Sequence, residues 1–220
     1  MRHTVLCGTL ALLVAVFLAS ACGDPQEGGT YPGEPMATIR GWVEVVRPVE
    51  SEAPRACLLW SVTSSSPDVL TTADSPVSGS FPARFEIDLV RPPPDSALND
   101  LGSDGRVGLS VVVAYDDRDG DGRVTFCEEG DPGQCEDGLL GGCPDHAVVW
   151  LPEEVRPGTY LEQFLGGTPP AGYHLMEVVR ANPDFGDRDS LRPLDAGFDT
   201  EITIILSDQE SDFEWPDFLK

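Results

Sequence analysis

Short stretches in which apolar and polar residues alternate, separated by glycine and proline, constrain the fold of this 220-residue chain most strongly. Residues 83–90 place Phe85, Ile87 and Leu89 on one face of an extended strand, with charged residues between them. Residues 107–115 are apolar at every second position and mostly small in between, which is typical of a strand buried on both faces. Further strands are predicted at residues 37–46, 56–62, 146–151, 173–179 and 201–207.

The chain contains 23 glycines and 20 prolines, a composition that suits many turns and few helices. Short helical turns are predicted at residues 94–101 and 159–165, and no long stripe with a period of 3.6 residues occurs. These features predict an all-β fold, an antiparallel β-sandwich of immunoglobulin-like or prealbumin-like kind with long loops. An internal repeat of fixed period, the mark of a propeller or solenoid, is absent from the sequence.

The N-terminus has the pattern of an export signal. A short basic start is followed by an apolar stretch at residues 5–18 and then by small residues. The apolar stretch is shorter than the roughly 20 residues that a membrane-spanning helix needs. The sequence Leu18-Ala-Ser-Ala-Cys22 resembles the lipobox of bacterial lipoproteins, although the leucine lies one position earlier than usual.

This resemblance implies that residues 1–21 are a lipoprotein signal peptide and that Cys22 is lipidated and anchors the chain in a membrane. Because Gly23, and not aspartate, follows the cysteine, the resemblance favours the outer membrane of the cell envelope. A secretory signal cleaved near Ala21 is the alternative, which would give a secreted or periplasmic protein.

The remaining chain is expected to divide into three parts. Residues 22–36 are rich in glycine, proline and acid and predict a flexible tether. Residues 37–208 contain all the predicted strands and form the sandwich domain. Residues 209–220 form an acidic-aromatic tail, whose three aromatic residues are expected to pack back onto the sandwich: Phe213, Trp215 and Phe218.

The chain is strongly acidic, with a formal net charge of −24. Such a chain repels nucleic acid and anionic lipid surfaces, so no nucleic-acid partner is expected. The acidity can serve cation binding, or it can serve solubility in a salty medium, as in a plain acidic lipoprotein without a metal.

Four cysteines remain beyond the signal and the lipidation position, and an exported protein permits disulfides between them. Cys57, Cys127, Cys135 and Cys143 are therefore disulfide candidates, with three ways of pairing them. A zinc site made by the last three and His146 is the alternative. The seven-residue gaps between the cysteines differ from the C-x₂₋₄-C spacing of zinc knuckles.

A twelve-residue run from Asp117 to Glu128 has the spacing D-x-D-x-D-G-x-V-x-x-x-E of an EF-hand-type calcium loop. Ca²⁺ takes six to eight oxygen ligands, and glycine at loop position 6 permits the sharp turn that brings them together. The predicted ligands are the carboxylates at positions 1, 3, 5 and 12 and the backbone carbonyl at position 7: Asp117, Asp119, Asp121, Glu128 and Arg123.

True EF-hands set this loop between two helices, whereas a predicted strand precedes it here. The run therefore resembles the DxDxDG calcium loops found outside EF-hand domains, as in dockerin-like and integrin-like repeats. Since such loops often recruit a distant carboxylate, four nearby residues could replace Glu128: Asp116, Glu129, Asp131 and Asp137. The alternative is an acidic surface turn without an ion.

No nucleophile or metalloprotease motif and no phosphate-binding glycine loop occurs in the sequence. His146 lies close to Cys143 and next to Asp145 in the sequence, but neighbours on a strand point to opposite faces, so no catalytic dyad is expected. The chain is therefore predicted not to be an enzyme, with a hydrolase that uses acidic residues as the alternative.

The order of predicted strand, Arg91-Pro-Pro-Pro, hydrophobic strand, DxDxDG loop and late Gly172-Tyr-His-Leu is similar to that of uncharacterised bacterial surface lipoproteins. The sequence thus predicts a lipid-anchored envelope protein that binds calcium. It would act as a structural or ligand-binding module with a glycan or protein partner at the cell surface.

Overall fold

The computed structural model describes residues 33–51, 53–61, 70–77, 80–120, 122, 124, 137–207, 215, 216 and 218. The segment Gly33–Lys220 forms one compact unit. The predicted signal, Cys22 and most of the tether lie outside the described residues. In the part that is described, no helix is long and apolar enough to cross a membrane.

The described residues form eleven strands. They are β1 (Ala37–Val45), β2 (Pro54–Ser61), β3 (Leu70–Pro76), β4 (Ala83–Leu89), β5 (Leu98–Asp100), β6 (Arg106–Asp117), β7 (Asp137–Gly142), β8 (His146–Leu151), β9 (Gly172–Asn182), β10 (Arg188–Pro193) and β11 (Ile202–Leu206). One α-helix, α1 (Tyr160–Leu165), and short 3₁₀ helices complete the elements, the latter at Asp95–Ala97, Gly102–Asp104, Pro183–Phe185 and Gly197–Asp199.

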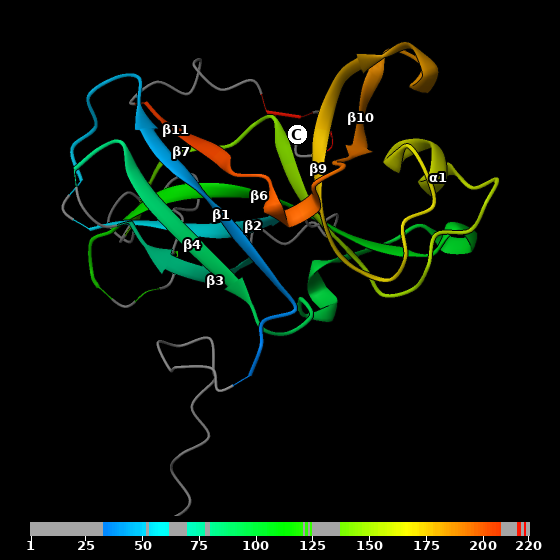
Figure 1. The fold of residues 1–220 in the computed structure, drawn as a ribbon, viewed down its shortest axis with the longest axis horizontal. Helices are drawn as coiled ribbons and strands as arrows, with labels where there is room; N and C mark the ends of the chain where they lie inside the picture. The colour runs from blue at the N-terminus through cyan, green and yellow to red at the C-terminus, as the bar shows by residue number, and fades with distance from the viewer. Residues whose placement is uncertain are drawn as a thin grey trace, which may run out of the picture. The chain divides into compact units, whose positions relative to one another are not determined.

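All these strands join in one mixed, open sheet with the order β10-β9-β8-β6-β7-β11-β1-β4. Strand β2 pairs with β6 and β3, and β5 pairs with β6. The sheet folds over itself, so that β1 and β4 cross in front of β2 and β6 (Figure 1). Buried residues from both layers share one hydrophobic core, which confirms the predicted all-β sandwich.

The prediction that the sandwich is antiparallel is wrong in one place. Strands β1 and β11 are parallel, with Gly41 opposite Ile202 and Val45 opposite Leu206. The other described strand pairs are antiparallel. A parallel neighbour is available because β11 follows β1 by more than 150 residues, which is ample chain for a crossover connection.

Strand β6 is the centre of the fold, and its residues from Val107 to Asp117 are all buried. Val112 contributes to the core between the two sandwich layers. On the opposite face, Val107 belongs to a second core next to α1 and Tyr115 to a third core. The predicted burial of this strand on both faces is therefore confirmed.

The helical turn predicted at residues 159–165 is confirmed as α1. Thr159 begins the helix by accepting a hydrogen bond from the backbone N–H of Glu162 at 3.2 Å. Gly166 ends it with a left-handed backbone at φ +65°. The buried face of α1 covers the second core, where Phe164 lies 5.6 Å from Phe218, ring centre to ring centre.

Two of the three tail aromatics pack onto the sandwich, as expected. Trp215 covers the third core, and Phe218 covers the second. The backbone carbonyl of Phe218 also accepts a hydrogen bond from Ser61 Oγ at 3.0 Å. Phe213 lies outside the described residues.

Four strands were not predicted, namely β3, β5, β7 and β10. Strand β7 escapes prediction because it contains glycine at three of six positions. The tertiary structure requires at least one of these glycines, Gly141, because a Cβ there would lie 1.9 Å from the carbonyl oxygen of Ile205 on β11. The acidic run at residues 184–189 passes through a 3₁₀ turn into the start of β10.

Candidate metal centre

Three aspartates converge where the central strand ends. Asp117 is the last residue of β6, and the strand register places it opposite Asp137, the first residue of β7. Asp119 follows two residues later in the predicted calcium loop. One carboxylate oxygen from each of the three lies within 4.8 Å of the other two. Asp117 and Asp137 are each only 4% exposed, whereas Asp119 is exposed.

The loop after Asp117 turns as its spacing predicts. Gly120 and Gly122 both have left-handed backbones, with φ of +74° and +73°, a conformation that favours glycine. The backbone N–H of Gly122 donates a hydrogen bond to Asp117 Oδ1 at 3.4 Å. Loop position 6 is thereby folded back onto loop position 1.

The structure brings together two of the five predicted ligands, Asp117 and Asp119. The other three lie outside the described residues: Asp121, Arg123 and Glu128. Among the four carboxylates considered as replacements for Glu128, Asp137 joins the cluster. Glu129 and Asp131 lie outside the described residues.

Asp116 does not join the cluster, because neighbouring residues on a strand point to opposite faces. Its Oδ1 accepts a hydrogen bond from Ser51 Oγ at 2.5 Å, and its Oδ2 accepts one from Arg118 Nε at 2.9 Å. The backbone N–H of Arg118 reaches the other face, where it donates to Asp137 Oδ1 at 3.3 Å. Asp116 thus ties the loop between β1 and β2 to β6.

A positive charge lies beside the three aspartates. Arg55 on β2 has its Nε 3.6 Å from Asp117 Oδ2. The same nitrogen forms an ion pair with Asp74 on β3. Tyr115, which faces Arg55 in the register of β2 and β6, donates its hydroxyl proton to Asp74 Oδ2 at 3.2 Å.

These contacts shift the protonation of the neighbouring groups. Burial, followed by the nearby charge of Asp74, raises the pKa of Tyr115, so that its hydroxyl stays a hydrogen-bond donor. Partial burial by itself lowers the pKa of Arg55, but the hydrogen bond and the charge of Asp74 raise it by more, so the pKa of Arg55 is raised overall. The sequence analysis did not identify Arg55, Asp74 or Tyr115 as part of this site. Arg55 and Asp74 lie about 40 or more residues from the loop, and Tyr115 belongs to no motif.

The disulfide prediction is wrong for Cys57 and Cys143, which are free, buried thiols. Cys57 belongs to the third core and Cys143 to the core between the sandwich layers. The two thiols therefore lie on opposite faces of the sheet and cannot bond to each other. Cys127 and Cys135 lie outside the described residues.

Cys143 and His146 are closer than their sequence positions predict. A turn between β7 and β8 brings Cys143 Sγ to 3.5 Å from His146 Nδ1, so the expectation that they point apart is wrong. Burial raises the pKa of the Cys143 thiol to about 12 and lowers the pKa of His146. The thiol is thus held in its protonated, weakly nucleophilic form.

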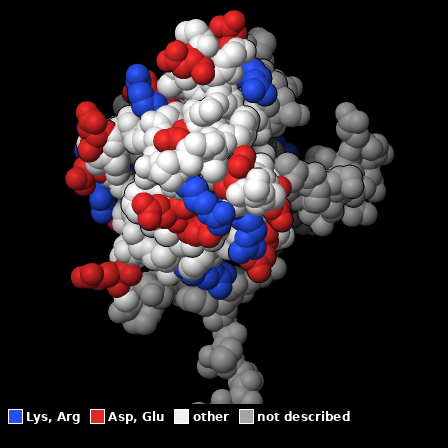
Figure 2. All heavy atoms as spheres, turned by 90° about the vertical axis from the view of Figure 1, so that its right-hand side faces the viewer, with Lys and Arg blue, Asp and Glu red and all other residues white. Residues whose placement is uncertain are grey.

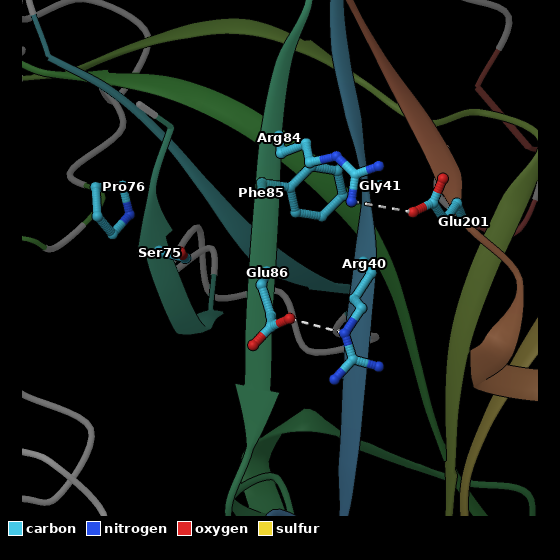
Figure 3. Close-up of a pocket in the computed structure, with 8 residues that line it drawn as sticks. All are labelled: Arg40, Gly41, Ser75, Pro76, Arg84, Phe85, Glu86 and Glu201. Carbon is cyan, nitrogen blue, oxygen red and sulfur yellow. Dashed lines mark hydrogen bonds and ion pairs between the residues drawn. The ribbon is translucent and has the colours of Figure 1, made fainter. Parts of the chain in front are cut away.

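A separate hollow of about 290 Å³ lies beside β1 and β4 (Figure 3). Arg40 Nε lies 2.7 Å from Glu86 Oε2. Arg84 on β4 reaches across β1, so that its guanidinium nitrogen lies 3.6 Å from a carboxylate oxygen of Glu201. Arg84 also stacks over the Trp42 ring at 4.3 Å. The charged residues that line this hollow therefore neutralise one another.

On the face drawn in Figure 2, acidic side chains and arginines are interspersed with one another. No family model, curated protein or solved structure matches the chain. The immunoglobulin-like or prealbumin-like subtype of the sandwich therefore stays a prediction.

Proposed function

We propose that this chain is a lipid-anchored protein of the cell envelope whose β-sandwich binds Ca²⁺ at the end of β6. Asp117, Asp119 and Asp137 would supply carboxylate oxygens to the ion. The observation that carries the proposal is the convergence of these three carboxylates within 4.8 Å, two from the DxDxDG run and the third from the start of β7.

Electrostatics supports a cation at this position. Two like charges 4.8 Å apart repel each other by roughly 3.5 kcal/mol at an effective dielectric constant of about 20. Asp117 and Asp137 are nearly fully buried, so water screens this repulsion poorly. A divalent ion among the three carboxylates would turn the repulsion into attraction.

The chemistry of the ligand set favours calcium over magnesium. Ca²⁺ accepts six to eight oxygens in flexible geometry, whereas Mg²⁺ demands near-octahedral geometry and keeps several waters. Three aspartates, together with the predicted loop ligands Asp121, Glu128 and the Arg123 carbonyl, offer the larger number.

The ion would join the end of β6, the loop and the start of β7. It would therefore stabilise the long connection between residues 117 and 137, which is the role of a structural or ligand-binding module. The cell-envelope address is proposed from the resemblance of residues 18–22 to a lipobox. The glycan or protein partner at the cell surface is likewise a proposal.

Thermal unfolding of the purified protein tests the calcium site. After metal is stripped with a chelator, calcium added to about 10 mM should raise the melting temperature, and magnesium at the same concentration should raise it less. An absence of any calcium-dependent rise would refute the site. The anchor is tested separately, since Cys22→Ser should release the protein from membranes of the native host.

A further inference from the structure

We propose, resting on the proposed calcium site, that Arg55 is a built-in counter-cation that competes with Ca²⁺ for Asp117 and thereby sets the affinity of the site. Asp74 is a second carboxylate partner of Arg55 and shares it with Asp117. Arg55 would be a positioning and affinity-setting residue, not a ligand of the ion.

The geometry places Arg55 on the same face of the sheet as the three aspartates. Arg55 pairs with Tyr115 across β2 and β6, and Asp117 lies two residues further along β6 on the same face. The side chain of Arg55 is 25% exposed and that of Asp117 is 4% exposed. A guanidinium Nε 3.6 Å from such a poorly hydrated carboxylate interacts with it strongly.

An irregular strand holds Asp74 against Arg55. The pairing of β2 and β3 shifts between Ala56 and Leu58, which marks a β-bulge in β3. Within the bulge, Ala73 has a φ of +51°, a conformation that costs energy for any residue with a Cβ. Bulges commonly re-aim a side chain next to a functional site, and here Asp74 meets both Arg55 and Tyr115.

The charge of Arg55 acts on the aspartates both with and without a bound ion. The guanidinium of Arg55 offsets part of the repulsion between Asp117 and the two other aspartates, so the fold tolerates the loss of the ion. When Ca²⁺ binds, the same positive charge opposes the new one. Asp74 gives Arg55 a second carboxylate partner, which lessens its hold on Asp117.

Two substitutions should therefore move calcium affinity in opposite directions. Arg55→Met removes the charge and keeps the length of the side chain, so calcium should bind at least fivefold more tightly, while the metal-free protein melts at a lower temperature. Asp74→Asn leaves Asp117 as the nearby carboxylate for Arg55, so calcium should bind more weakly. Arg55→Lys keeps the charge and is the matched control, with an affinity close to that of the wild type.

Isothermal titration of calcium chloride into the purified, chelator-treated protein decides the matter. A wild type that binds calcium together with an Arg55→Met variant that binds equally or more weakly would overturn the role of Arg55 and leave the calcium site standing. If neither the wild type nor any variant binds calcium, both proposals fail. If Arg55→Met does not fold, Asp74→Asn decides, because an unchanged affinity in that variant also overturns the inference.

Discussion

Replacing Asp119 by asparagine should separate the effect of the ion from that of the fold. Asp119 is exposed, and substitutions at such positions usually change the free energy of unfolding by about 0.5 kcal/mol or less. Its loss also relieves repulsion with Asp117 and Asp137, whose carboxylate oxygens lie within 4.8 Å. Without metal, the variant should therefore be as stable as the wild type or slightly more stable.

With calcium, the order should reverse. For a dissociation constant of about 10⁻⁴–10⁻³ M, the range of extracellular sites, 10 mM calcium stabilises the wild type by about 1.4–2.7 kcal/mol. This corresponds to a rise in melting temperature of roughly 3–11 °C for a domain of this size. If the lost charge weakens the site tenfold, the gain falls to about 0.4–1.4 kcal/mol.

The assay is urea or thermal unfolding of both proteins, in chelator and in calcium. Asp195→Asn is the matched control, because it removes the same charge from another exposed aspartate. The reasoning is refuted if Asp119→Asn retains the full calcium-dependent gain. It is equally refuted if the two variants lose the gain to the same extent, since the effect would then come from net charge alone.

Two further predictions follow from the buried titratable groups. Burial raises the pKa of Cys57 and Cys143, so both thiols should resist alkylation at pH 8 in the native protein. Both should react once the protein is unfolded in denaturant, without any reductant. Peptide mass spectrometry that finds either cysteine linked in a disulfide would contradict this. Burial lowers the pKa of His146, against the opposing charges of Asp145 and Glu177, so the unfolded state takes up a proton first as the pH falls. The stability that neutral His146 contributes is complete above its unfolded pKa of about 6.5 and declines below it. His146→Gln should flatten the stability profile between about pH 7 and pH 5, whereas parallel profiles would argue against the assignment.

Local patterns in the sequence determined two of the strands, their buried faces and the turn of the acidic loop. Alternation in residues 83–90 and 107–115 predicts β4 and β6 with their buried faces, because the side-chain period of a strand depends only on the strand itself. The same holds for the turn after Asp117, where Gly122 takes the left-handed backbone that its loop position predicts. Such features require no knowledge of distant residues.

Pairings between distant segments were decided by the tertiary structure. Only the register of β6 and β7 places Asp137 beside Asp117, and only the pairing of β2 with β3 and β6 brings Arg55 and Asp74 to the same point. Cys57 and Cys143 are separated because they face different cores. Strand register and layer packing depend on the burial of the whole sheet, and no local spacing in the sequence encodes them.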